Sequence, residues 1–320
     1  MSNTTQSNSS SSMTKKQRKQ KRNNEKYNNN PRTIQGELEK VLSQRFQRLV
    51  KVVGAGRTDG GVHARGQAIH FDLYHNETER ANANSLSTID SSSFERDLET
   101  TMNRMLPSDI RVWNVGPANR TLVTNTGSEY TPPGWYNWNA MRTSTSKLYS
   151  YRICIGDAMN PSERHHRWQL PWRGVDPDQL KRILHYFEGE HDFVCFAGAL
   201  EQQEKKTGIA IGTVRTIHKI KLVQETVTKN RSDTDKDSMG GDTSRHYYRI
   251  DIYLDGALYK MVRNIVGTAI DVARGWLDEG TLIQLLKEPS ELNYTRKDNV
   301  CKPAPSNGLT LERVFYPDEF

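Results

Sequence analysis

The fold and function of this 320-residue chain are most clearly indicated by GAGRTDGGVHARGQAIHFDL, residues 54–73, which follows a short apolar run at 50–53. Glycines after an apolar strand are typical of nucleotide-binding loops, but those loops lead into a helix whose N-terminus holds the phosphates. Here the glycines lead into residues 68–73, which alternate as a strand does, and no lysine follows in P-loop position. The pattern therefore argues against a nucleotide-binding protein.

The same stretch places Arg57 and Asp59 two residues apart among four glycines. Glycine lets a backbone approach a ligand closely, and a carboxylate in such a loop near an arginine can act as nucleophile or base. An aspartate before two glycines is also a common turn residue. The local sequence leaves both interpretations of Asp59 open, a catalytic carboxylate and a turn former.

The composition limits the class of protein. The apolar share is 34% and the mean hydropathy is −0.80. No run of residues reaches the roughly 18 apolar positions of a membrane-spanning helix. Cysteine is found only at Cys154, Cys195 and Cys301. Three scattered cysteines predict neither a disulfide scaffold nor a zinc cluster and indicate an intracellular, reducing compartment.

The net charge of +7 is concentrated at the N-terminus. Residues 1–30 contain seven Lys or Arg, one Glu and almost no apolar side chains, a composition that predicts a disordered tail. The run KKQRKQKR at 15–22 resembles a nuclear signal and the Ser-rich start resembles a transit peptide, with a plain solvated tail as the simpler alternative. Residues 31–320 are nearly neutral, so their net charge says little about what the protein binds.

Helical and strand-like patterns are mixed along the rest of the chain, which predicts an α+β architecture. Helices are expected from residue 33 onward and at 94–105, 175–189 and 260–275; strands at 50–53, 68–73, 110–115, 147–155, 213–223 and 246–254; and polar insertions or loops near 75–93, 116–134 and 228–244.

The segment GRTDGGVHARGQAIHF, residues 56–71, closely resembles the active-site motif of the TruA-type tRNA pseudouridine synthases. Further segments stand in the order of that family: TIQGELEKVL (33–42), MNRMLPSDIRV (102–112), KLYSY (147–151), GEHDFVCF (189–196), TVRTI (213–217), LYKMVRNIVGTAIDVARG (258–275) and APSNGLTLERVFYP (304–317). The resemblance spans roughly residues 33–317, and so many motifs in one order make it specific.

This resemblance implies a pseudouridine-synthase fold, with two α+β halves around a mostly antiparallel central sheet and an RNA-binding cleft between them. The halves would cover residues 31–156, which hold the Asp59 loop, and 157–320. The implied activity is that of an isomerase, an intramolecular transferase that converts uridine to pseudouridine in the anticodon stem-loop, around tRNA positions 38 to 40. It implies a homodimer that binds tRNA, with no metal, small-molecule cofactor or membrane.

The resemblance also implies the roles of individual residues. Asp59 is the expected nucleophile, and whether it attacks C1′ of the sugar or C6 of the base stays open. Tyr149 is expected to stack on the target base, although its strand position also suits a core aromatic. Arg263 is expected to pair with Asp59. Contacts with RNA are expected from Arg57, His63 and Arg65; a zinc site at His63 and His70 lacks a third ligand, and His70 is expected to make a structural hydrogen bond.

Two segments differ from the family pattern. Family members begin with a strand carrying a G-T-x-[Y/F]-x-G-W-Q segment, whereas here the tail runs directly into PRTIQGELEK, 31–40. In WNAMRTSTSKLY, 138–149, Met141 occupies the place of an arginine and Arg142 the next. These differences support an alternative, a catalytically impaired tRNA-binding paralogue or the product of a truncated gene model.

Overall fold

The computed structural model describes residues 31–74, 77, 92–118, 120–123, 134–156, 159–170, 174–225, 246–287, 289 and 291–317. The basic tail and most of the predicted insertions lie outside the described residues. The described chain combines helices with a mostly antiparallel sheet, which confirms the α+β class. Among the described helices, none has the length and apolar character that crossing a membrane requires.

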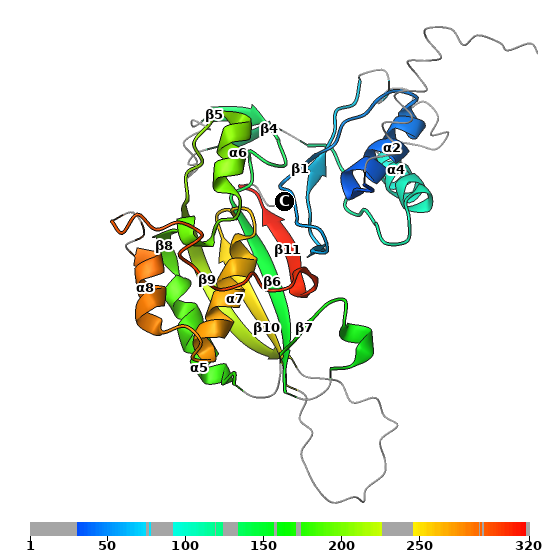
Figure 1. Cartoon of the computed structure of the whole chain (residues 1–320). Helices are drawn as coiled ribbons and strands as arrows, with labels where there is room; N and C mark the ends of the chain where they lie inside the picture. The colour runs from blue at the N-terminus through cyan, green and yellow to red at the C-terminus, as the bar shows by residue number, and fades with distance from the viewer. Residues whose placement is uncertain are drawn as a thin grey trace, which may run out of the picture. The chain divides into compact units, whose positions relative to one another are not determined.

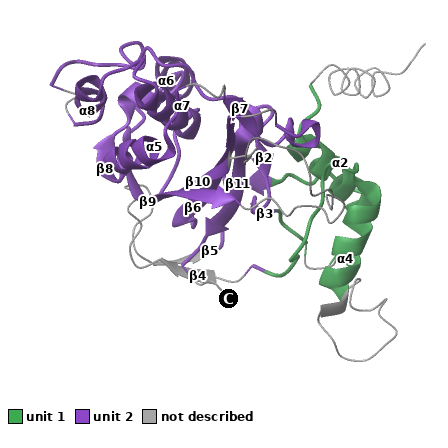
Figure 2. Ribbon diagram, turned by 90° about the horizontal axis from the view of Figure 1, so that it is seen from below, with its two compact units in different colours: residues 1–52, 71–117 green, residues 53–70, 118–320 purple. Residues whose placement is uncertain are grey.

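The chain forms two compact units, coloured separately in Figure 2. Unit 1 comprises residues 1–52 and 71–117, and unit 2 comprises 53–70 and 118–320. This division differs from the expected boundary at residue 156, which falls inside unit 2. The reason is that the loop 53–70 packs with C-terminal elements, since one of its strands pairs with a strand that begins at Leu309.

Unit 1 is built on two helices, α2 (Ile34–Phe46) and α4 (Ser92–Met105). Thr33 caps α2 by accepting a hydrogen bond from the backbone N–H of Gly36 at 3.0 Å. The apolar spacing of α2 buries Leu38, Val41 and Leu42, and Leu98 and Met102 of α4 are buried as well. The structure thus confirms the helices expected at both places.

The strand expected at 110–115 is absent from the described structure, where this segment has no regular hydrogen-bond ladder. The side-chain amide of Asn103 takes the place of a partner strand. It donates to the carbonyl of Val112 at 2.7 Å and accepts from the N–H of Val112 at 2.9 Å. The strand predicted from the alternation of IRVWNV is therefore wrong, because side chains of the preceding helix bond the backbone at Val112 and Val115 in place of a partner strand.

Unit 2 is organised around a seven-stranded sheet with the order β2-β11-β6-β10-β9-β8, in which β7 also pairs with β6. Figure 1 shows β11, in red, beside β6. Two pairings are parallel, β2 with β11 and β6 with β7, and the others are antiparallel. The strands are β2 (His63–Ala64), β6 (Ser146–Ile155), β7 (Trp168–Leu170), β8 (Gly189–Asp192), β9 (Val214–Glu225), β10 (His246–Leu254) and β11 (Leu309–Phe315).

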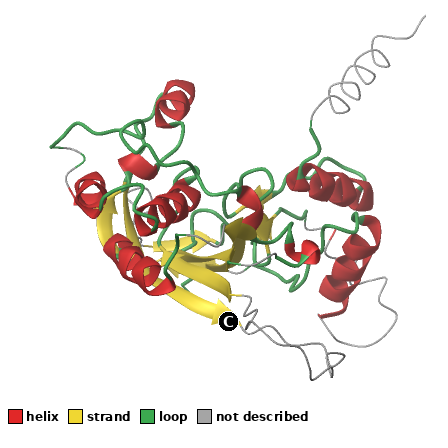
Figure 3. Ribbon diagram, turned by 60° about the horizontal axis from the view of Figure 1, so that its bottom comes forward, coloured by secondary structure: helices red, strands yellow, loops and turns green. Residues whose placement is uncertain are grey.

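Helices α5 and α7 pack against this sheet through one apolar cluster, and Figure 3 shows helices, in red, beside the yellow strands. One apolar cluster joins them to β6, β9 and β10, with Ile153, Ile250 and Ile252 among its fully buried members. The helices of unit 2 are α5 (Pro177–Leu184), α6 (Leu200–Thr207), α7 (Met261–Ala273) and α8 (Glu279–Lys287), with short 3-10 turns at Pro161–Glu163, His185–Phe187, Val194–Phe196 and Ser306–Gly308.

Two small sheets complete unit 2, and both differ from expectation. The strands expected at 50–53 and 68–73 shrink to β1 (Val53–Gly54) and β3 (Ile69–His70), which pair with each other. The segment expected to be loop at 116–134 contains β4 (Arg120–Val123), paired with β5 (Gly134–Asn137). Four residues in a polar segment are too short to show a clear alternation, which is why β4 was missed.

Candidate active site

The loop between β1 and β2 holds Asp59 at the start of a tight turn. The carbonyl of Asp59 accepts a hydrogen bond from the N–H of Val62 at 3.1 Å, and Gly61 inside this turn has φ of 79°, a conformation that favours glycine. Asp59 is therefore a turn former, as one interpretation of the sequence held. That role fixes its backbone and leaves the carboxylate for other contacts.

The carboxylate of Asp59 is paired with Arg263 of α7. Arg263 Nη1 donates to Asp59 Oδ2 at 2.8 Å, and each side chain is only 15% exposed. A second bond, from Arg263 Nε to the carbonyl oxygen of Ala304 at 2.7 Å, fixes the plane of the guanidinium. Two directed hydrogen bonds at low exposure make Arg263 an orienting partner for the carboxylate rather than a surface charge.

Tyr149 on β6 stands next to this pair. It is partly buried and packs against both the main core and a small cluster that includes Ala55 and Leu311. Burial, together with the negative charge of Asp59, raises the pKa of Tyr149 to about 12. Tyr151, two residues further and on the same face, is fully buried and donates to the carbonyl of Pro305 at 2.7 Å. Tyr151 is thus a core residue, whereas Tyr149 is a neutral aromatic near the carboxylate.

The other predicted site residues lie on both sides of Asp59, with Arg57 in the loop before it, His63 on β2 and Arg65 directly after β2. Arg57 and Arg65 are exposed. His63 Nε2 lies 2.7 Å from the carbonyl of His165, and its ring contacts that of His166 at 4.5 Å between centroids, with the two planes tilted by 40°. These contacts tie His63 to the protein, while Arg57 and Arg65 are exposed and Arg65 Nη1 lies 3.9 Å from Glu312 Oε2.

His70 makes the structural hydrogen bond that the sequence predicted. Its Nδ1 accepts from the backbone N–H of Ala140 at 3.2 Å, and its ring meets Trp138 edge-on.

Two residues that the sequence did not point to bind the backbone at Ala55 and Gly56, which form the neck of the Asp59 loop. Lys147 Nζ donates to the carbonyl of Ala55 at 3.0 Å, and Gln67 Nε2 donates to the carbonyl of Gly56 at 2.8 Å. The period of two along β6 places Lys147 on the same face as Tyr149. That spacing was the available signal for Lys147.

The loop is anchored to β11 at Gly66, where the two backbones touch. The N–H groups of Arg65 and Gly66 both donate to the carbonyl of Leu311, at 2.8 and 3.2 Å. A Cβ at position 66 would overlap the carbonyl group of Glu312. Only glycine allows this approach, and the approach sets where the Asp59 loop lies on the sheet.

Gly66→Ala should therefore destabilise the protein by at least about 2 kcal/mol, because a backbone atom, and not a flexible side chain, must move. Urea unfolding measures the effect. Gly212→Ala is the matched control, since a Cβ there meets no described atom within 4 Å. Equal stability of the two variants would show that β2 and β11 are not held by this contact.

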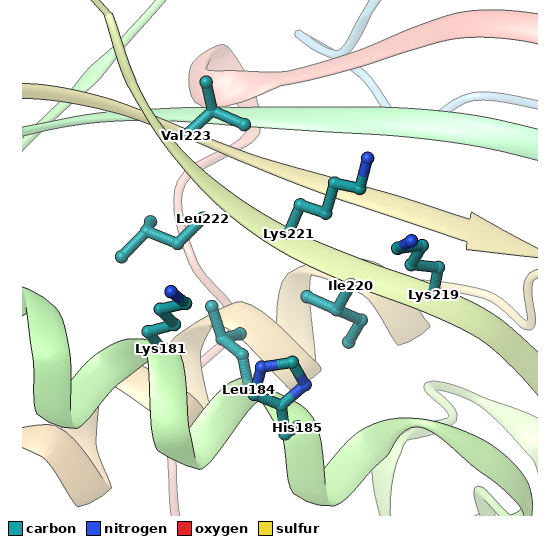
Figure 4. A pocket seen from close by; sticks show the side chains of 8 residues that line it. All are labelled: Lys181, Leu184, His185, Lys219, Ile220, Lys221, Leu222 and Val223. Atoms are coloured by element: carbon teal, nitrogen blue, oxygen red, sulfur yellow. The ribbon is translucent and has the colours of Figure 1, made fainter.

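A pocket of about 270 Å³ lies elsewhere in unit 2, between the end of α5 and β9. Figure 4 shows four basic side chains around it, with Leu184 and Ile220 near its middle; its lining residues are Lys181, Leu184, His185, Lys219, Ile220, Lys221, Leu222 and Val223. None of the predicted site residues lines it. The Asp59 site and this pocket are separate features, because β10 stands between β9 and the strand that carries Tyr149.

Comparison with known proteins gives one consistent family. A family model described as tRNA pseudouridine synthase matches residues 183–317. The tRNA pseudouridine synthase A of Akkermansia muciniphila is 32% identical over 290 residues, covering 90% of this chain and 88% of the relative. Similar proteins from Desulfotalea psychrophila (31% over 289 residues, 90% of this chain and 92% of the relative) and Thermodesulfovibrio yellowstonii (28% over 285 residues, 89% and 91%) also match. At this identity and coverage, and with the aspartate loop, tyrosine strand and arginine helix meeting in one place, the chain belongs to the TruA-type tRNA pseudouridine synthases and is an isomerase of that family.

Proposed function

We propose that this protein converts uridine to pseudouridine in the anticodon stem-loop of tRNA, with Asp59 as the nucleophile. The observation that carries the proposal is the hydrogen bond of 2.8 Å between Arg263 Nη1 and Asp59 Oδ2 at a site that also contains Tyr149. A carboxylate fixed by a guanidinium and set beside a neutral aromatic ring suits a reaction that attacks a flipped nucleotide.

The reaction is redox-neutral and balances within the nucleotide. The bond from C1′ to N1 of the uracil breaks, the base turns, and C1′ bonds to C5. The proton that leaves C5 is matched by one that N1 gains. A carboxylate can form a temporary ester at C1′ or an adduct at C6 and leave again as a carboxylate. Arg263 holds Asp59 in the orientation that either attack needs.

The exposed arginines supply the remaining contacts with RNA. Arg57 and Arg65 lie on the loop and strand on either side of the Asp59 turn, and their guanidinium groups suit the phosphates that flank a flipped base. The resemblance also leads us to propose that a homodimer binds the tRNA. The mass of the protein by light scattering, alone and with tRNA, tests this proposal.

The direct experiment uses tRNA transcripts carrying tritium at C5 of uridine, because formation of the new bond releases that tritium to water. We expect release from transcripts with intact anticodon stem-loops and none when the uridines of that stem-loop are replaced by cytidine. Transcripts with uridines replaced in the D-loop are the matched control. Tight tRNA binding without any release would support the alternative of an inactive tRNA-binding paralogue.

Tyr149→Phe should keep the rate of a single turnover within about tenfold of wild type, because the ring that stacks on the base stays in place. Tyr149→Ala removes that ring and should slow the reaction by about 5- to 150-fold, which corresponds to the loss of about 1–3 kcal/mol of stacking. Since the pKa of Tyr149 is about 12, its hydroxyl should not titrate in a pH–rate profile that ends at pH 10. A strongly impaired Tyr149→Phe would instead assign the hydroxyl a chemical role.

A further inference from the structure

Among the described residues, Lys147 is the one side chain outside the loop that donates a hydrogen bond to the backbone at the neck of the Asp59 loop, where apolar side chains such as Tyr149 and Leu311 also pack. Its ammonium donates to the carbonyl of Ala55 at 3.0 Å, four residues before Asp59. Contacts from within the loop hold the same place, since Ala55 N–H donates to the carbonyl of Ala68 at 2.9 Å and Gln67 donates to Gly56 at 2.8 Å. Of these three hydrogen bonds, only the one from Lys147 connects the loop to β6.

The ammonium of Lys147 is partly withdrawn from water. Lys147 is partly buried, and among the described residues no carboxylate lies within 4.0 Å of its Nζ. Burial and the positive charge of Arg215 both lower the pKa of Lys147. A neutral side chain of similar length would avoid this desolvation. A partly buried ammonium that has no described carboxylate beside it and is bonded to the backbone of the Asp59 loop points to a role in placing that loop.

The positions of Lys147 and Tyr149 on β6 indicate what this role is. Lys147 and Tyr149 are two residues apart on one face, so the same stretch of strand carries the aromatic ring and the anchor of the loop. Asp59 is held on its other side by Arg263 from α7. Through Lys147, the backbone at the loop neck is tied by a hydrogen bond of 3.0 Å to the strand that carries Tyr149.

We propose that Lys147 is a positioning residue for the reaction: its bond to the Ala55 carbonyl sets the Asp59 loop at the distance from Tyr149 that attack on the base requires. The inference rests on the proposed function and adds a residue to it. Lys147 acts through Ala55 and the loop, and contact with the RNA is not part of its role.

The first test replaces Lys147 by Ala and by Met and separates chemistry from binding. We expect the single-turnover rate at saturating enzyme to fall by about tenfold or more, since small misplacements of reacting groups have effects of that size. The Kd for tRNA should stay within twofold, with an unchanged salt dependence, and Tm should not fall below that of wild type. Lys219→Ala, an exposed lysine on β9, is the control for loss of one positive charge from the sheet.

A second test leaves Lys147 in place and moves its ammonium. A Cβ at Gly56 would lie 3.2 Å from Lys147 Nζ, with no other described atom within 4 Å beyond the chain neighbours. Gly56→Ala should therefore slow the reaction through Lys147 alone. In the Lys147→Ala background, Gly56→Ala should have no further effect on the rate, so the two substitutions are expected to be strongly non-additive.

Three outcomes overturn the inference. A raised Kd with a shallower salt dependence in Lys147→Met would make Lys147 a phosphate contact. A lowered Tm with rate and affinity falling together would make it a structural residue. Full-rate turnover in Lys147→Ala, with an active wild type, would exclude any role. A wild-type protein that forms no pseudouridine would overturn the proposed function itself and the inference with it.

Discussion

Asp59→Asn is expected to abolish pseudouridine formation while leaving tRNA affinity within several-fold of wild type. The amide has nearly the shape of the carboxylate but cannot form the covalent bond that the reaction needs. The variant should still fold, with a loss of about 1–3 kcal/mol, because the half-buried Arg263 keeps a neutral acceptor in place of an ionised one. Tritium release from labelled tRNA measures the activity, and filter binding measures the affinity.

The control for this substitution is Asp72→Asn, which makes the same chemical change at an exposed aspartate two residues past β3. It should leave both turnover and binding unchanged. Substantial turnover in Asp59→Asn would remove Asp59 from the role of nucleophile. A simultaneous loss of tRNA binding would instead point to a damaged loop, which a urea melt of the same variant would reveal.

Arg263→Met is expected to have the second largest effect, lowering turnover by about 100-fold or more with a smaller effect on tRNA affinity. Methionine keeps the aliphatic stem but loses the bonds to Asp59 Oδ2 and to the carbonyl of Ala304. Asp59 then lacks its orienting partner, and a misaligned nucleophile reacts slowly even when the substrate is bound. Single-turnover assays separate this loss from any change in Kd.

We also expect a change in the stability of Arg263→Met. Arg263→Met leaves a half-buried carboxylate without a counter-charge, so adding Asp59→Asn should restore part of the lost stability. Arg182→Met is the matched control, because its exposed pair with Glu279 should contribute at most about 1 kcal/mol. If the stability losses of Arg263→Met and Asp59→Asn simply add in the double variant, and turnover in Arg263→Met is normal, then Arg263 and Asp59 do not act together.

Elements with strong, uniform patterns were predictable from the sequence. β10 was expected at 246–254 and occupies His246–Leu254, and α7 lies within the expected 260–275, because alternation and helical spacing there are continuous. The strand expected at 110–115 failed because the decisive partner, Asn103, is a side chain on the preceding helix. Local patterns carry no information about such a contact.

The site was predictable only in part for the same reason. Asp59 and Arg263 are separated by 204 residues, and no local spacing could bring them together. The resemblance to a family suggested the pair, and the fold supplied the distance, the second bond to Ala304 and the anchor at Lys147. The membership of residues 53–70 in unit 2 was missed because it depends on the parallel pairing of β2 with β11, a contact between distant parts of the chain.

The pairing of β2 with β11 also bears on the order in which the protein is made. A ribosome synthesises the Asp59 loop early, but β11, on which that loop rests, and the Ala304 carbonyl, which steadies Arg263, come after nearly all of unit 2. A nascent chain that stops before residue 304 therefore carries Asp59, the proposed nucleophile, without this support. The candidate site can therefore assemble only after synthesis has passed β11, so we expect an unfinished chain to be inactive.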